Sequence, residues 1–295
     1  MRQLKWLGLW LVVAALASGC TDHFGKSGCC GCKSGSGPDA EATGSSENES
    51  SSTGSTGDNG QYVSLNADGE WGTVSGQVVW EGTLPERAEI DVSNNPDGPT
   101  CIAKGKLYDE KWIVNKDNKG VRWVFVWLQP DGSGEMPVHP TLAKPDKEEV
   151  ALDQPCCQFV DHAFAMRAGQ ALIAKNSSSL GHNVKWFNKD NGEGNVIVPA
   201  GRSLKIFDKM KASVRPMSIE CNIHGWMKCW VRIFDHPYYA VTDENGKFEM
   251  KLAPAGKYRL IVWNEEGWGP DGKDGTPITI KGETDAGKIV INASK

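Results

Sequence analysis

The segment Cys221–Met227, which reads CNIHGWM, restricts the possible folds of this chain more than any other stretch. It carries a thiol at Cys221, an imidazole at His224 and a thioether at Met227, each three residues after the last. On one tight loop these groups can converge on a single soft metal ion. A second imidazole, His182, stands upstream at the start of an apolar run that is typical of a strand. Strand and loop together predict a rigid β scaffold that brings the four side chains to one point.

The chemistry of these four side chains favours copper. Two imidazoles, one thiolate and a weakly held thioether are the ligands of blue copper sites, in which the methionine sits long and weak. Zinc is the alternative metal, but methionine is a poor zinc ligand. Taken singly, His182, Cys221 and Met227 would each be expected in core packing or an ordinary hydrogen bond. Their order and spacing together predict one mononuclear copper site.

The pattern Cys-x2-His-x2-Met, preceded by His-Asn-Val, resembles the cupredoxins, the type 1 blue copper proteins. Its short loop is most similar to that of the amicyanin/plastocyanin-like members, and the resemblance covers residues 148–235. It departs at Gly225-Trp226, where the family usually has a proline. By this resemblance the copper ligands are His182, Cys221, His224 and Met227, and Asn183 is the residue that ties the histidine strand to the cysteine loop.

The resemblance implies a Greek-key β-sandwich, and the composition agrees with an all-β protein. The chain has 34 Gly and 12 Trp among 295 residues and few long helical patterns. Within residues 148–235, short apolar runs bounded by turn residues predict strands. They are Val150–Leu152, Phe159–Arg167, Ala171–Lys175, Val184–Phe187, Ser203–Phe207 and Val214–Cys221.

A second small β-sandwich is predicted from the residues on either side of this domain. The turn Thr242–Phe248, Thr-Asp-x-x-Gly-x-Phe, and the hairpin Pro254–Tyr258, Pro-x-Gly-x-Tyr, resemble the carboxypeptidase regulatory-like sandwich. That family begins with a Gly-x-Val strand and a valine-rich strand. Here the corresponding pieces stand far upstream, at Gly76–Val79 and Val124–Leu128.

We therefore predict that the cupredoxin domain, residues 148–235, is inserted into the second sandwich. That sandwich would be discontinuous, with its first part in residues 62–130 and the remainder in residues 236–295. Residues 121–128, an apolar run expected to be buried on both faces, should then share a sheet with residues 247–263.

The N-terminal part of the chain predicts export to the cell envelope. Residues 1–20 have the features of a secretory signal, with Arg2 and Lys5 ahead of an apolar run. The end of this run, Leu-Ala-Ser-Gly-Cys, resembles the bacterial lipobox, which implies lipid on Cys20; cleavage without lipid is the alternative. Residues 21–61 are poor in apolar side chains, so we expect a disordered Ser/Gly-rich tether. These features predict a bacterial lipoprotein, periplasmic or on the outer surface.

Nine cysteines constrain the chain further. With Cys20 assigned to lipid and Cys221 to copper, seven remain. Three lie in the tether, where disulfides or metal binding helped by a nearby histidine are open alternatives: Cys29, Cys30 and Cys32, with His23. The other four are an even number, which in an oxidising compartment is consistent with two disulfides: Cys101, Cys156, Cys157 and Cys229.

The pairing of the last four cysteines stays open at the level of sequence. In a cupredoxin the strand after the methionine ligand runs parallel to the strand that follows Cys157. The resemblance therefore implies a bridge from Cys229 to Cys156 or Cys157, with Cys101 taking the other. His162 would lie near the same end of the domain. A second metal site made by Cys157 and His162 is one interpretation, and a disulfide beside an ordinary hydrogen-bonded histidine is the one we favour.

By resemblance, the chain is an electron-transfer protein that cycles one type 1 copper ion between Cu(I) and Cu(II). Its partner would be a periplasmic redox protein, either a c-type cytochrome or a dehydrogenase, with a solvent-near imidazole of His224 as the exit for the electron. The lipid anchor would attach the protein to a membrane. The net charge of −5 is spread along the chain, which argues against nucleic acid as a partner.

An enzyme is not expected, because the sequence offers no open ligand position, no nucleophile paired with a base and no pair of acids. The alternative from another class is a surface or periplasmic lipoprotein whose copper is structural or stored and whose β-sandwiches are binding modules. A binuclear oxidase-type centre would need a second cysteine in the ligand loop, and Cys229 lies beyond Met227.

Overall fold

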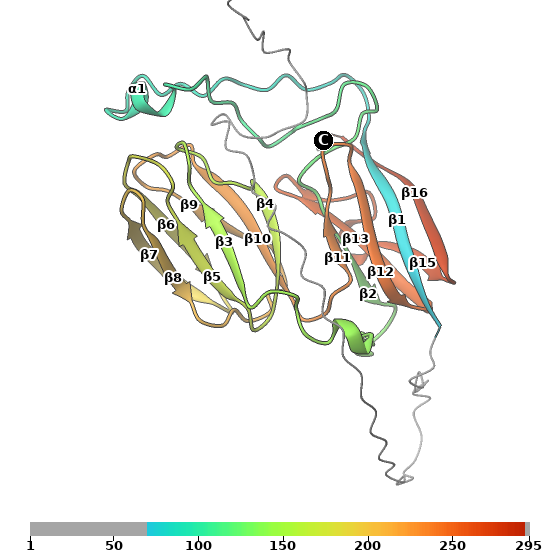
Figure 1. Ribbon diagram of the computed structural model, residues 1–295. Helices are drawn as coiled ribbons and strands as arrows, with labels where there is room; N and C mark the ends of the chain where they lie inside the picture. The colour runs from blue at the N-terminus through green and yellow to red at the C-terminus, as the bar shows by residue number, and fades with distance from the viewer. Residues whose placement is uncertain (1–69, 293–295) are drawn as a thin grey trace, which may run out of the picture.

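The computed structural model describes residues 70–292, and this part of the chain is all-β, as predicted. Two β-sandwiches lie side by side (Figure 1). The described residues also include a short helix, α1 (Gly98–Cys101), and two 3-10 turns, Pro140–Leu142 and Gly272–Asp274. None of the described helices combines the length and the hydrophobicity needed to cross a membrane. The predicted signal, residues 1–20, and the tether, residues 21–61, lie outside the described residues.

The first sandwich packs a five-stranded sheet against a three-stranded one. The larger sheet has the order β4 (Ala163–Arg167), β10 (Lys228–Phe234), β9 (Met217–Glu220), β6 (His182–Asn188) and β7 (Gly192–Val198). The smaller has the order β3 (Glu149–Asp153), β5 (Ala171–Lys175) and β8 (Ser203–Phe207). Alternate side chains of each strand point into the space between the sheets, so Cys229, Val231 and Ile233 of β10 are buried there.

Strand β7 was missed by the sequence analysis because it has no run of buried apolar residues. It is a mostly exposed edge strand that pairs only with β6 in the described sheet. Gly194 stands opposite Trp186, and a Cβ added at this glycine would lie 2.3 Å from the indole ring. The aromatic ring therefore covers the glycine, and that contact replaces the cross-strand pairs that a richer sequence would supply.

The second sandwich is built from segments on both sides of residues 148–235. One sheet has the order β12 (Lys247–Pro254), β1 (Trp71–Trp80) and β16 (Glu283–Ile291). The other has the order β11 (Tyr239–Val241), β2 (Phe125–Pro130), β13 (Gly256–Asn264) and β14 (Gly267–Trp268), with β15 (Thr276–Ile280) also pairing with β13.

Strand β2 runs antiparallel to β13, with Phe125 opposite Trp263 and Leu128 opposite Leu260. The expected sheet between residues 121–128 and residues 247–263 is therefore present in part: β2 pairs with β13, whereas β12 lies in the opposite sheet, beside β1. The exact domain boundaries stay a prediction.

The turn motif that suggested the second sandwich has a clear physical basis. The hydroxyl of Thr242 donates to the carbonyl of Val121 at 2.7 Å and accepts from the amide of Val124 at 3.0 Å, which joins this turn to the start of β2. Gly246 has φ of 71°, and a Cβ at this position would lie 2.2 Å from the carbonyl oxygen of Val78. Only glycine fits there without strain.

An aromatic layer joins the two sandwiches. Strand β2 is buried on both faces, as predicted: Val126 and Leu128 face the core of the second sandwich, while Phe125 and Trp127 face the first sandwich. The other buried members of this layer are Trp123, Ala163, Phe234, Ile261 and Trp263. The guanidinium of Arg232 lies 3.6 Å from the centre of the Trp127 ring, a cation–π contact in the same layer.

Replacing Trp127 with Ala should lower the free energy of unfolding by about 3–5 kcal/mol, because a buried indole is lost from a packed layer. Trp127 is only 3% exposed, whereas Phe187, the matched control, is 74% exposed. Phe187→Ala should change the same quantity by less than about 0.5 kcal/mol. Urea unfolding followed by circular dichroism measures both, and equal losses would contradict the role of the layer.

Candidate metal centre

The four predicted ligands lie together at one end of the first sandwich. His182 opens β6, Cys221 follows the last residue of β9, and His224 and Met227 lie on the loop that leads into β10. All four are buried, with exposed fractions of 2% or less. Two hydrogen bonds close the loop: the amide of Cys221 donates to the carbonyl of Met227 at 3.1 Å, and the amide of Met227 donates to the carbonyl of His224 at 2.8 Å.

Three of the donor atoms converge. The Nδ1 atoms of His182 and His224 lie 2.9 Å apart, and the sulfur of Cys221 lies 4.0 Å from Nδ1 of His224. One ligand atom from each of the three residues lies within 4.8 Å of the others. Bonds of about 2.0–2.3 Å from one metal ion to nitrogen and sulfur would place its ligands at such mutual distances. The side chain of Met227 is buried in the same core.

The outer nitrogen of each imidazole has a hydrogen-bond partner of its own. Nε2 of His182 lies 3.0 Å from the hydroxyl of Ser178, and Nε2 of His224 lies 3.1 Å from a carboxylate oxygen of Asp97. Such outer partners fix the ring orientation of a metal-bound histidine. Both rings therefore turn Nδ1 toward the shared point.

Burial keeps both imidazoles neutral at pH 7. Burial, followed by the neighbouring His224, lowers the pKa of His182 to about 4. Burial also lowers the pKa of His224, against the opposing effect of the hydrogen bond to Asp97. A neutral imidazole has a free lone pair for a metal.

Asn183 connects the histidine strand to the cysteine loop. Its Oδ1 accepts hydrogen bonds from the amides of Asn222 at 2.7 Å and Ile223 at 3.2 Å, and from the thiol of Cys221 at 3.3 Å. Its amide nitrogen donates to Oδ1 of Asn195 on β7 at 2.7 Å, which fixes the orientation of the side chain. This asparagine is therefore the direct link between the first ligand and the other three.

The imidazole of His224 is not near solvent, so the expectation of a solvent-near ring is wrong, while its role as the electron exit stays a prediction. Its exposed fraction is 0%, because a segment between β1 and β2 passes over it. Asp97 of this segment contacts the imidazole, and Asn95 donates to the carbonyl of Ile223 at 2.9 Å. Asn94–Gly98, with the sequence NNPDG, has the composition of a turn. Nothing in that stretch indicates which loop it would cover.

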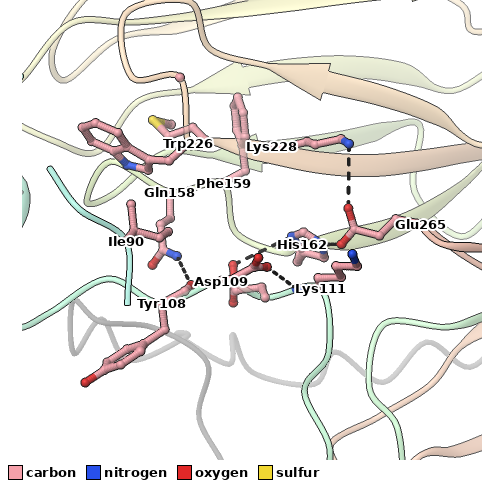
Figure 2. Close-up of a pocket in the computed structure, with 13 residues that line it drawn as sticks. Ile90, Tyr108, Asp109, Lys111, Gln158, Phe159, His162, Trp226, Lys228 and Glu265 are labelled. Atoms are coloured by element: carbon pink, nitrogen blue, oxygen red, sulfur yellow. Dashed lines mark hydrogen bonds and ion pairs between the residues drawn. The ribbon is translucent and has the colours of Figure 1, made fainter. Parts of the chain in front are cut away.

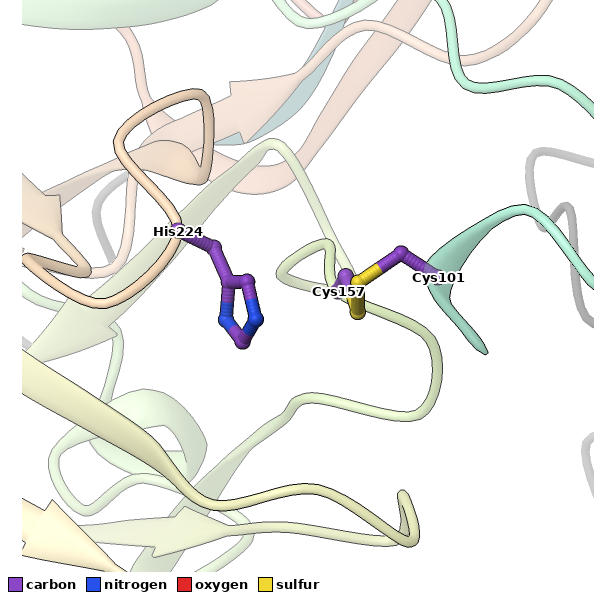
Figure 3. A group of neighbouring side chains, drawn as sticks. All are labelled: Cys101, Cys157 and His224. Carbon is purple, nitrogen blue, oxygen red and sulfur yellow. A yellow bond between two sulfur atoms is a disulfide. The ribbon is translucent and has the colours of Figure 1, made fainter. Parts of the chain in front are cut away.

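The disulfide pattern confirms the expected pairing of Cys101 with one of Cys156 and Cys157 and corrects the prediction for Cys229. Cys101 is bonded to Cys157, and this disulfide lies beside His224 (Figure 3). Cys229, expected to bridge to Cys156 or Cys157, is a buried free thiol, because it stands at an inward-facing position of β10. Burial raises the pKa of this thiol. Cys156 is disulfide-bonded as well.

A cavity of about 260 Å³ lies on the methionine side of the loop, where Trp226 and Met227 line one wall (Figure 2). His162 lines it too, with Nε2 2.9 Å from a carboxylate oxygen of Glu265 and Nδ1 4.0 Å from a carboxylate oxygen of Glu110. The interpretation of Cys157 and His162 as a second metal site is wrong, since Cys157 is in a disulfide and His162 is hydrogen-bonded to Glu265.

Two residues at the centre were missed by the sequence analysis, Asp97 and Ser178. Ser178 stands in the run Ser177-Ser178-Ser179 just ahead of His182, a proximity that could have suggested it. Asp97 is separated from His224 by more than a hundred residues and gives no such signal. The predicted lipidation site, Cys20, and the tether cysteines, Cys29, Cys30 and Cys32, lie outside the described residues.

No protein family model matches the sequence, and no curated protein matches it. Among solved structures, the Cu(I) form of a mutant amicyanin is 14% identical, with a TM-score of 0.26, over 31% of this chain and 88% of that one. A purple cupredoxin from Nitrosopumilus maritimus is 11% identical, with a TM-score of 0.24, over 30% of this chain and 100% of that one. Amicyanin from Paracoccus versutus is 17% identical, with a TM-score of 0.23, over 31% of this chain and 85% of that one. TM-scores this low carry no argument, so the function of the site rests on its own side chains.

Asn183→Ala should lower the free energy of unfolding of the metal-free protein by about 2 kcal/mol, because loop amides lose their acceptor. It should also weaken metal binding, since the cysteine loop is no longer tied to the histidine strand. Asn94→Ala, at an exposed position of the covering segment, is the control and should change neither quantity. Urea unfolding and metal titration measure the two effects, and an Asn183 variant as stable as the control would contradict this role.

Proposed function

We propose that this chain is a copper protein with one mononuclear type 1 site, and that it transfers electrons. The observation that carries the proposal is the buried convergence of two imidazole Nδ1 atoms and one thiol sulfur within 4.8 Å. The residues that would hold the ion are His182, Cys221 and His224, with the sulfur of Met227 as a further, weaker donor. Asn183 would hold the ligand loop in place through its hydrogen bonds to Cys221, Asn222 and Ile223.

The donor set fits copper better than zinc. Structural zinc sites are closed by four cysteine or histidine ligands, and zinc seldom takes a thioether. A thiolate, two imidazoles and a methionine match the preferences of copper in both oxidation states. When bound, copper would supply a one-electron step between Cu(I) and Cu(II). The protein would supply a dry, fixed frame that needs little rearrangement when the charge of the site changes.

In the wider proposal the protein is anchored by lipid at Cys20 in a bacterial envelope and is not an enzyme. It would exchange electrons with a periplasmic redox protein, either a c-type cytochrome or a dehydrogenase. These parts rest on the sequence resemblances alone. The lipid anchor and the location are independent of the metal centre and can fail separately, whereas the redox partner depends on it.

A second candidate is a lipoprotein whose copper is structural or stored. The observation that favours it is the complete burial of His224, which leaves no imidazole edge open to a redox partner. The two candidates differ in one measurable property. An electron-transfer site shows a reversible couple at a defined potential, whereas a structural site holds one oxidation state and loses its fold when the metal is removed.

Adding Cu(II) to the full chain should produce an intense thiolate-to-copper absorption band, and Cys221→Ser should abolish it because the thiolate is lost. Cys229→Ser is the matched control, since Cys229 is also a buried free thiol but lies outside the ligand group. It should keep the band. Visible and electron paramagnetic resonance spectra measure the result, and a spectrum indifferent to Cys221 would reject the type 1 site.

Met227→Leu should keep the absorption band and raise the reduction potential, because removing a weak donor disfavours Cu(II) more than Cu(I). Met217→Leu is the control, since Met217 is equally buried in the same core but stands on β9, before the ligand loop. Protein-film voltammetry measures both variants. An unchanged potential in Met227→Leu would remove this residue from the ligand set.

A further inference from the structure

Residues 92–101, between β1 and β2, lie over the metal loop, residues 221–227, and form what we call the cap. The cap belongs to the connection between two strands of the second sandwich, yet Val92 is buried in the core of the first. The hydrogen bond from Asn95 to the carbonyl of Ile223 ties the cap to the metal loop. The disulfide from Cys101 to Cys157 ties it to the segment between β3 and β4. In Figure 1, α1 at the end of the cap lies above the first sandwich.

Asp97 has an unusual role at the start of α1. It stands at the N-cap position, where an aspartate side chain ordinarily accepts a hydrogen bond from an amide of the first turn. Here the side chain makes no such bond, and its Oδ2 lies 3.1 Å from Nε2 of His224 instead. The local stability of α1 therefore does not account for an acid at this position, whereas contact with the imidazole does.

A carboxylate on the outer nitrogen of a metal-bound histidine has two effects. It holds the ring with the inner nitrogen toward the metal, and it makes that nitrogen a stronger donor. A stronger donor stabilises Cu(II) relative to Cu(I), so the reduction potential falls. The side chain of Asp97 is 37% exposed while that of His224 is 0% exposed, which places the negative charge at the outer rim of an otherwise closed site.

We propose that Asp97 is a positioning residue of the copper site and that the cap places it beside His224. The carboxylate orients His224 and lowers the reduction potential, while the cap closes the edge of the imidazole to solvent and to any partner. This inference rests on the proposed copper site for its effect on potential. The closing action of the cap does not require copper and can be tested in the metal-free protein.

The effect on potential is tested by Asp97→Asn in the full copper-loaded chain. Asparagine keeps an acceptor oxygen and nearly the same shape but removes the charge, so the absorption band should remain and the reduction potential should rise. Asp97→Ala should raise it at least as far. Asp91→Asn is the matched control, because Asp91 is an exposed acid just before the cap whose carboxylate hydrogen-bonds Ser93. It should leave the potential unchanged.

An Asp97→Asn variant with the wild-type potential would overturn the proposed role of the charge. If Asp97 only stabilised the fold, its replacement could lower the stability of the protein but would not change the reduction potential. Asp97→Asn tests this directly, because asparagine has nearly the same shape and can keep the contact with His224. The Asp97→Ala variant therefore has to be read beside Asp97→Asn, because only the second separates charge from packing.

The closing action of the cap is tested by alkylation of Cys221 in the metal-free full chain, with the labelled site identified by peptide mapping. The double variant Cys101→Ala, Cys157→Ala releases the cap from its disulfide and should increase the rate of labelling at Cys221 several-fold. Cys229 is an internal reference, since it is a buried thiol away from the cap. A rise at both thiols would report general unfolding and would reject the specific effect, as would an unchanged rate at Cys221.

The two tests separate the inference from the function on which it rests. If wild-type protein gives no thiolate-to-copper band, the proposed function and the effect on potential fail together, and the labelling experiment still decides whether the cap closes the site. If the band is present and Asp97→Asn leaves the potential unchanged, the proposed function stands and the role of Asp97 is rejected.

Discussion

The candidate centre depends on keeping two imidazole nitrogens and one thiol sulfur close together in a buried core. Burying a polar group lowers the stability of the fold unless the group is hydrogen-bonded. Here two imidazoles and a thiol are buried together at one end of a small sandwich. Each is supported from outside: Ser178 contacts His182, Asp97 contacts His224, and Asn183 accepts from Cys221. Without these partners the buried polar atoms would carry an uncompensated desolvation cost.

The supports of the centre come from both sandwiches, and the aromatic layer between them makes this possible. Trp127 and Trp263 from the second sandwich pack with Phe234 from the first, so the two bodies share a buried surface. The chain between β1 and β2 can then reach across with a defined geometry and deliver Asp97 to His224. The metal centre is therefore a property of the pair of sandwiches and not of one alone.

How far the sequence predicted the structure follows from the range of each contact. The ligand group and the strands around it were predictable, because Cys221, His224 and Met227 share one loop and β5 has a continuous apolar run at its predicted bounds. The pairing of β2 with β13 was predictable from a known turn motif. The Cys101–Cys157 bond was one of two pairings that the resemblance implied. The cover over His224 was not predictable, since it depends on the path of a long connection with little periodicity. Strand β7 was missed because most of its residues are exposed and two of them are glycines, one of which is covered by Trp186.

The discontinuous second sandwich has a consequence for how the protein is made. The ribosome produces the cap first, the ligand residues later, and β12, β13 and β16, which complete the second sandwich around β1 and β2, last. Domains generally fold as units during synthesis, but contacts between distant segments form only when both are present. The contacts that hold the cap reach Cys157, Ile223 and His224, so the centre can be covered before β12, β13 and β16 are made. Completion of the second sandwich then fixes both ends of the connection that carries the cap.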